Sequence, residues 1–235
     1  MKAIFKKEFK SYFYSPIGYV FVAIFFFVAS LFFSMYNLYK GSSDINMVFN
    51  NMTLIFLFLT PIITMRLLAE EKNAKTDQLL FTSPVKVTSV VMGKFFAAIS
   101  VFAIAMALTA VYPLLLAKFT KPDWGKIVSN YIGFMFMGAA FVSIGLYISS
   151  LTENQIIAAV ATFGVLFLLY LIDFFSTVVT APILREIISF VSITTKFKDF
   201  SMGIIDIGAI VYYIGVVVVF VYLTVFHIEK RRWSK

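Results

Sequence analysis

The sequence predicts an all-helical integral membrane protein with six transmembrane helices, an N-terminal amphipathic interfacial helix, and short outer re-entrant helices between spans five and six. Of the 235 residues, 61% are hydrophobic and only 14% are charged, whereas a soluble domain carries about a quarter charged residues. Six apolar runs reach the roughly 20 residues with which a helix crosses a hydrocarbon core. No soluble domain of useful size interrupts them, so we expect residues 1–235 to form one membrane domain.

Several classes of chemistry are excluded by what the chain lacks. There is no cysteine, which excludes disulfides, thiolate catalysis and cysteine-ligated metals, and one histidine, His227, cannot build a metal site alone. The nearest fragment of a phosphate-binding loop, Gly93-Lys94, lacks the upstream glycine and the following hydroxyl. We therefore expect no active site, cofactor or metal in this chain. The net charge of +8 could suit nucleic acid, but the placement of the basic residues fits membrane orientation better, so no nucleic-acid partner is expected.

The first segment, residues 1–16, alternates basic and aromatic residues. At helical spacing Phe5, Phe9 and Tyr12 share one face, and Lys6 and Lys10 another. This pattern predicts a helix lying in the membrane interface with its lysines toward anionic headgroups. Ser15-Pro16 then turns the chain into the bilayer. The alternative is a basic flank that only sets the topology.

The spans follow from the apolar runs. Their predicted ranges are 17–39, 52–68 (with a kink at Pro61), 90–117, 127–150, 156–175 and 207–226. A polar segment containing Asn46, Asn50 and Asn51 leads into span two. Residues 176–206 hold two apolar pieces too short to cross, 181–193 and 197–207, and are predicted to be the outer re-entrant segment. Arg66, near the end of span two, is expected to extend toward lipid phosphates.

Lysine and arginine gather on one side of this arrangement, the side that holds both termini and the loop after span two. Because such residues are retained on the cytoplasmic side, both termini are predicted to be cytoplasmic. An even number of spans is required for that.

The loop at residues 70–89 is the long polar interval on the inner side. Thr76 can cap a short helix, with Asp77 favourable in its first turn. The residues that follow give that helix a polar and an apolar edge before Ser83-Pro84 stops it: Gln78, Leu79, Leu80 and Phe81. Such a helix could seat in the groove of a partner outside the membrane. A solvated loop with leucines resting on the membrane fits the spacing equally well.

The stretch EEKNAKTDQLLFTSPV, followed by GKF, resembles the first cytoplasmic loop of ABC exporter permeases of the type-2 (ABC-2) membrane family. The matching positions are Glu70, Glu71, Lys72, Thr76, Leu79, Leu80, Ser83, Pro84, Val85, Gly93 and Lys94. Three further stretches are similar to the gliding-motility-type branch of that family: KKEFKSYFYSPIGYVF near the start, SSLTENQIIAAVATFG at 149–164 and FKDFSMGIID at 197–206. The resemblance covers the whole chain, with the six spans in order.

The resemblance implies a dimer, formed with a second permease copy or a paralogue, in the cytoplasmic membrane of a prokaryote. A separate cytoplasmic ABC ATPase would bind ATP and magnesium and drive export. Thr76 to Phe81 would be the coupling helix in the ATPase groove, residues 1–16 the elbow helix, and residues 176–206 the closure of the exit. A second, smaller inner contact is implied at Glu153, Asn154 and Gln155.

Two positions depart from the family pattern. Many members have glycine where Lys75 stands and glutamate where Gln78 stands, so the resemblance does not assign the charges that meet the ATPase. The sequence identifies no substrate residue. The lack of ionisable residues in mid-span argues for an amphiphilic or apolar cargo. The alternatives are a membrane anchor or assembly protein that transports nothing, and an ATP-independent carrier.

Overall fold

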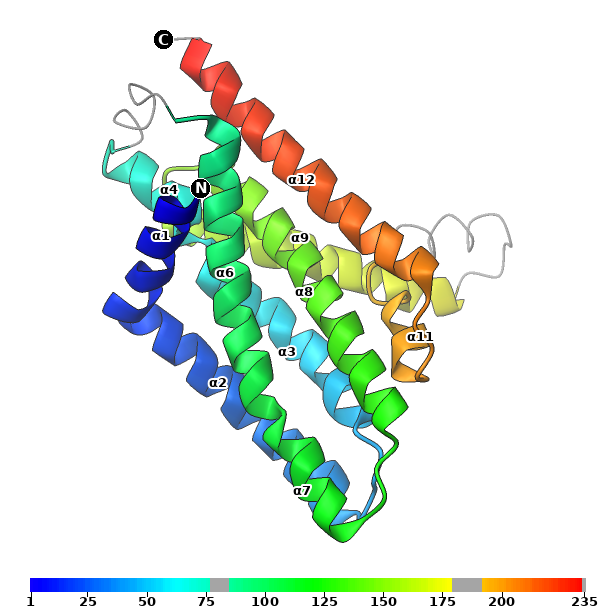
Figure 1. Ribbon diagram of the computed structural model, residues 1–235. Coiled ribbons are helices and arrows are strands. Elements are labelled where there is room, and N and C mark those ends of the chain that lie inside the picture. The colour runs from blue at the N-terminus through cyan, green and yellow to red at the C-terminus, as the bar shows by residue number, and fades with distance from the viewer. Residues whose placement is uncertain (77–84, 179–191, 234–235) are drawn as a thin grey trace.

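The computed structural model describes residues 1–76, 85–178 and 192–233, and it shows a bundle of long, tilted helices (Figure 1). Within these residues six helical segments are long and apolar enough to cross a membrane, and there is no strand. The six segments are Pro16–Tyr39, Asn46–Asn73, Val87–Phe119, Trp124–Leu151, Gln155–Ile172 and Ile207–Arg232. The predicted fold class and number of spans are therefore confirmed.

Three of the six segments are built from two consecutive helices. The pairs are α2 (Pro16–Phe33) with the π-helical η1 (Ser34–Tyr39), α3 (Asn46–Thr64) with α4 (Arg66–Asn73), and α6 (Val87–Thr109) with α7 (Val111–Phe119). Pro113 accounts for the last break, because it has no N–H to donate to the Thr109 carbonyl. The other three segments belong to α8 (Trp124–Leu151), α9 (Gln155–Val178) and α12 (Ile207–Trp233).

The second segment begins six residues earlier than predicted. Residues 46–51 were expected to be a polar lead-in, but they form the first turns of α3. Asp44 accounts for the difference, since its Oδ1 accepts a hydrogen bond from the Asn46 N–H over 3.0 Å. Asn130 on α8 then donates to the Asn46 side chain over 2.6 Å. These polar partners let asparagines begin a helix that the apolar pattern alone would start at Met52.

The centre of the bundle is α8, which contacts α3, α6, α9, α12 and the short helix α11 (Phe197–Ser201). Four phenylalanine rings from four helices meet there: Phe25 of α2, Phe56 of α3, Phe102 of α6 and Phe134 of α8. Every pair among them has ring centroids between 4.5 and 6.3 Å apart. Offset and edge-to-face contacts of this kind stabilise a core beyond its buried area.

The first helix, α1 (Lys2–Tyr14), lies beside α6 (Figure 1). The two backbones approach closely at Gly93, where a Cβ would lie 3.0 Å from the Ile4 side chain. On the outer side of α1, Lys2, Lys6 and Lys10 are exposed. Ser15 ends α1 in an extended conformation, and Pro16 is the first residue of α2. The expected N-terminal helix and its break are thus present.

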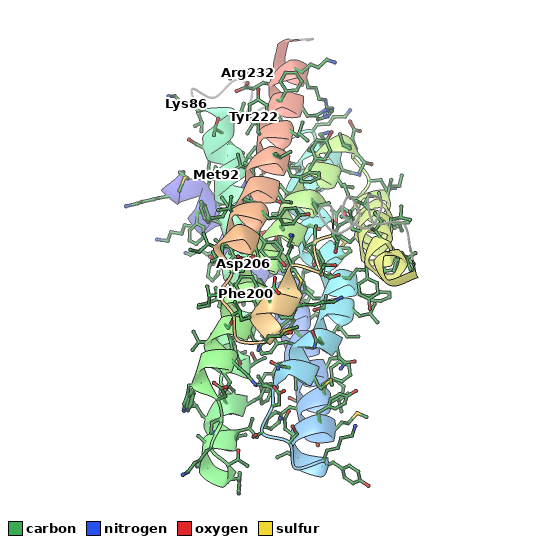
Figure 2. The ribbon with its side chains drawn as sticks, turned by 90° about the vertical axis from the view of Figure 1, so that its right-hand side faces the viewer. Lys86, Met92, Phe200, Asp206, Tyr222 and Arg232 are labelled. Carbon is green, nitrogen blue, oxygen red and sulfur yellow. The ribbon has the colours of Figure 1, made fainter. Side chains whose placement is uncertain are left out.

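Both termini lie toward the same end of the bundle, away from α7 (Figure 1). Figure 2 shows Lys86 and Arg232 near that end and Phe200 and Asp206 well away from it. We call it the N-terminal end. The described part of the predicted re-entrant segment contains α11, which is far too short to span and buries Phe197 and Phe200. Residues 179–191, which include most of the first predicted piece, lie outside the described residues.

Candidate coupling site

The predicted coupling residues begin where α4 ends, at the N-terminal end. Thr76 is exposed, and its hydroxyl donates to the Glu71 carbonyl over 3.3 Å, so it closes α4. Its role as the cap of a following helix involves residues outside the described part of the chain and stays a prediction. The remaining predicted residues lie outside the described part of the chain: Asp77, Gln78, Leu79, Leu80 and Phe81. Their role stays a prediction. The helices on either side of them are α4 and α6.

The end of α4 is a Schellman motif with lysine at the position that usually holds glycine. The Lys75 N–H donates to the Lys72 carbonyl over 3.1 Å, and the Thr76 N–H donates to the Glu71 carbonyl over 3.0 Å. Lys75 has a φ of 55°, and this left-handed conformation favours glycine. The departure from the family pattern at position 75 therefore falls on a strained residue.

A buried ion cluster lies at the start of α6. Lys94 is 1% exposed, and its Nζ lies 3.2 Å from Glu8 Oε1 of α1 and 3.0 Å from Glu71 Oε1 of α4. Lys7 reaches the same two oxygens at 3.7 and 3.5 Å, but its side chain is 72% exposed. Because a buried ammonium is costly unless it is paired, the two carboxylates satisfy Lys94. Glu71 Oε2 is buried and has no hydrogen-bond partner among the described residues.

Arg66, the first residue of α4, binds α1 instead of extending to lipid phosphates as the sequence predicted. Its Nη1 and Nη2 donate to the hydroxyls of Ser15 and Ser11, each over 2.6 Å. Its Nε lies 3.0 Å from Glu70 Oε2, and the guanidinium lies over the Tyr12 ring at 5.6 Å. The reason for the difference is that α1 presents hydroxyl acceptors within reach, so the guanidinium is satisfied inside the protein.

Tyr12 adds a further link from α1 to the end of α3. Its buried hydroxyl donates to the Ile63 carbonyl. Burial raises the pKa of the Tyr12 phenol well above its ordinary value, while the charge on Arg66 acts in the opposite direction. The phenol therefore stays neutral and remains a hydrogen-bond donor.

Ser149 of α8 holds the break between α3 and α4. Its hydroxyl accepts from the N–H groups of Leu68 and Ala69, each over 3.1 Å, and donates to the Met65 carbonyl over 3.0 Å. These groups belong to the turn in which the helical ladder is interrupted, so the hydroxyl replaces missing backbone partners. Next to it, the buried Lys72 Nζ donates to the Ser150 carbonyl. Both contacts fix α4 to the end of α8.

The second predicted contact lies in the turn between α8 and α9, at the same end of the bundle. Glu153 is exposed, and its Oε1 accepts from Arg231 Nη2 of α12 over 3.1 Å. Asn154 caps α9, because its Oδ1 accepts from the N–H of Ile156 over 2.8 Å. Gln155 is the first residue of α9 and is partly exposed. The structure thus shows local roles for Glu153 and Asn154, and the ATPase contact stays a prediction.

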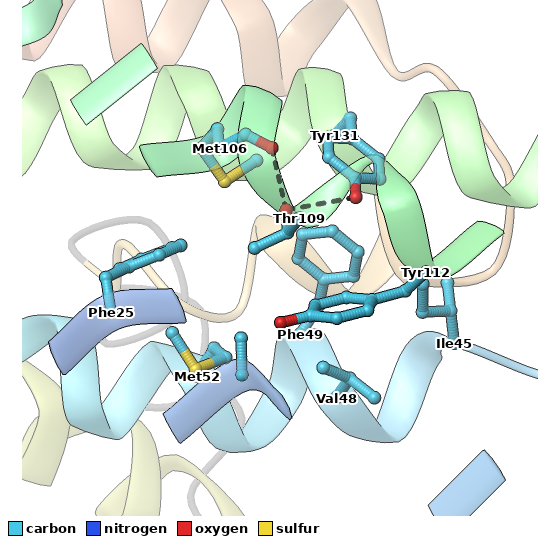
Figure 3. A pocket seen from close by; sticks show the side chains of 10 residues that line it. Phe25, Ile45, Val48, Phe49, Met52, Met106, Thr109, Tyr112 and Tyr131 are labelled. Atoms are coloured by element: carbon cyan, nitrogen blue, oxygen red, sulfur yellow. Dashed lines mark hydrogen bonds between the residues drawn. The ribbon is translucent and has the colours of Figure 1, made fainter. Parts of the chain in front are cut away.

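A narrow apolar pocket lies between α2, α3, α6 and α8, beside the four-ring cluster (Figure 3). The Thr109 hydroxyl at its wall donates to the Met106 carbonyl over 2.7 Å and lies 3.0 Å from the Tyr131 hydroxyl. Tyr112 is likewise bonded to Ser30, over 2.7 Å. Because these hydroxyls already have partners, the pocket is best described as a packing site, and it assigns no substrate residue.

Sequence reasoning missed the role of Glu8 and Lys94. The available signal was a lone acid in a lysine-rich segment and a lone lysine a full two turns into an apolar helix. A charge at such a position needs a partner. The identity of the partner depends on the packing of α1 on α6, which the pattern of charged and apolar residues in the sequence does not reveal.

The fold defines a multi-pass membrane protein, and comparison with known families makes this more specific. Residues 34–226 match the family model described as ABC-2 family transporter protein. The match covers most of the chain, so this chain belongs to the ABC-2 transporter family and is an ABC transporter permease. A comparison with curated proteins found no match.

Proposed function

We propose that this chain is the transmembrane subunit of an ABC exporter of the gliding-motility-type branch, in the cytoplasmic membrane of a prokaryote. It works as a dimer with a second permease chain, and a separate ATPase subunit supplies ATP binding and hydrolysis, with magnesium. The observation that carries the proposal is the family membership together with the positions of the helices on either side of residues 77–84. The end of α4 at Asn73 and the start of α6 at Val87 both lie toward the N-terminal end of the bundle (Figure 1).

The features around that segment suit force transfer. The start of α4 is fixed to α8 by Ser149 and its end by Lys72, and Glu71 near the end pairs with Lys94 of α6. A force that displaces α4 relative to α6 would therefore act on three membrane spans, those that contain α4, α6 and α8. Within the described spans, the ionisable side chains lie toward the helix ends, which supports an amphiphilic or apolar cargo.

The test is co-purification with a candidate ABC ATPase from the same organism. Leu79→Asp with Leu80→Asp places two charges on the apolar edge that would enter the ATPase groove, so we expect loss of the complex and of permease-stimulated ATP hydrolysis. The matched control is Leu38→Asp with Tyr39→Asp, an exposed adjacent pair at the end of η1, which we expect to leave both the complex and the hydrolysis unchanged. Gel filtration in detergent checks that each variant is folded.

An ABC exporter subunit, a non-transporting membrane anchor and an ATP-independent carrier predict different outcomes of this test. A complex that survives the Leu79, Leu80 double substitution with normal hydrolysis would remove the coupling role of this segment. A stable complex without stimulated hydrolysis would favour a non-transporting anchor. Failure of the parent chain to bind any ABC ATPase would favour an ATP-independent carrier.

A further inference from the structure

Lys94 connects helices that are far apart in the chain. Its two carboxylate partners come from α1 and α4, and neither comes from its own helix. The side chains of Glu8 and Glu71 are only 13% and 14% exposed. Removing the ammonium would leave two carboxylates close together with little water around them, which is unfavourable. The cluster therefore favours one relative position of α1 and α4.

A second connection joins the same two helices at their other ends. Arg66 begins α4 directly after the break at Met65, and it binds Ser15, which is the break between α1 and α2. The two breaks are thus adjacent in space. Beyond this point of attachment at Arg66, the Lys94 cluster is a buried contact that holds the N-terminal half of α1 near α4.

We propose that Lys94 makes α1 and α4 a single mechanical unit, so that a displacement of the C-terminal end of α4 reaches α2 through α1 as well as α3 directly. Lys94 is a positioning residue in this scheme. The source of the displacement rests on the proposed function. The contact that Lys94 makes between α1 and α4, which we call the joint, does not depend on it. Gly93 supports the joint. Because glycine has no side chain, α1 can pack closely against α6 next to Lys94.

The joint is tested in the permease alone. Because the chain has no cysteine, spin labels can be placed through Ala3→Cys on α1 and Asn73→Cys on α4, both at exposed positions. We expect one narrow distance distribution in lipid nanodiscs for the labelled parent. Lys94→Met should replace it with a broad one, and Lys94→Arg should restore the narrow one. An unchanged distribution in Lys94→Met would overturn the proposal.

Two further variants sharpen this measurement. Lys7→Met is the matched control, since Lys7 contacts the same oxygens from an exposed position where ion pairs contribute little. The distance distribution should stay narrow in this variant.

Glu8→Gln covers the case in which Lys94→Met fails to fold, because it weakens the link to α1 and leaves the pair of Lys94 with Glu71. It should also broaden the distribution, and a narrow one would contradict the joint.

Transmission is tested with the ATPase bound. A label pair at Ala3→Cys and Lys121→Cys reports the movement of α1 relative to the opposite end of the bundle. We expect a non-hydrolysable ATP analogue to shift this distance in the parent complex and not in the Glu8→Gln complex. A shift that persists in Glu8→Gln would overturn transmission through the cluster. A parent complex without any shift would refute ATP-driven displacement, and the measurement on the permease alone would still decide the joint.

Discussion

Lys75 offers a test of backbone strain at a single residue. Its φ of 55° places a side chain in the left-handed region, which costs about 1 kcal/mol or more for a residue other than glycine. Lys75→Gly should therefore stabilise the end of α4 by roughly 1 kcal/mol, seen as slower hydrogen exchange at the Lys75 and Thr76 amides that close it. Lys75→Ala removes the same charge and keeps the strain. Equal protection in the two variants would mean that charge, and not conformation, sets the stability.

Single residues were predicted unevenly from the sequence. The resemblance to the ABC-2 family pointed to the triplet of Glu153, Asn154 and Gln155, and its contact with an ATPase stays a prediction. Arg66 was misplaced, since its acceptors Ser11 and Ser15 lie more than fifty positions earlier in the chain. Lys94 was assigned no partner for the same reason, because Glu8 and Glu71 come from other helices. Residue types reveal that a partner is needed, but only the packing of helices reveals which one.

At the scale of helices, close packing against α8 depends on small residues. A Cβ at Gly138 would lie 2.2 Å from the Phe102 ring, whereas a Cβ at Gly164 of α9 would meet nothing within 4 Å. Gly138→Ala should destabilise the protein by about 1–3 kcal/mol, because the ring belongs to the four-ring cluster and has little room to move. Gly164→Ala should be neutral or stabilise by up to about 1 kcal/mol through helix propensity.

Thermal unfolding in detergent, followed for both variants beside the parent, checks the opposite signs. The same substitution in two helices controls for the change in residue type. If both glycines gave the same shift, the tight contact of α8 with α6 would be refuted.

The helices also show which features of the fold can be predicted from the apolar pattern alone. The number and order of the spans follow from hydrophobic runs, so six spans could be predicted from the sequence. The start of α3 could not, because it depends on Asp44 and on Asn130 of another helix. The break at Met65 lies four residues beyond Pro61, at the point where Ser149 supplies bonds that the backbone lacks. Helix ends set by tertiary contacts are the part that local patterns miss.

For the whole molecule, the arrangement of the ends favours an even number of spans. The chain begins and finishes toward the same end, and the long basic stretch at Lys230, Arg231 and Arg232 finishes there too. The N-terminal end also carries the exposed lysines of α1. Basic residues stay on the cytoplasmic side during insertion, so the coupling segment should face the compartment that contains ATP.

Single cysteines in this cysteine-free chain test that orientation directly. Asn73 and Lys121 are exposed. Asn73 is the last residue of α4 and Lys121 follows the end of α7, and these two helices lie at opposite ends of the bundle (Figure 1). A membrane-impermeant maleimide should label Lys121→Cys in intact cells, and Asn73→Cys only after the membrane is opened. Neither change weakens the charge bias, since Asn73 is neutral and Lys121 lies on the side predicted to be outside. The reverse pattern would put the segment after α4 out of reach of any cytoplasmic ATPase, and the proposed function would fail with it.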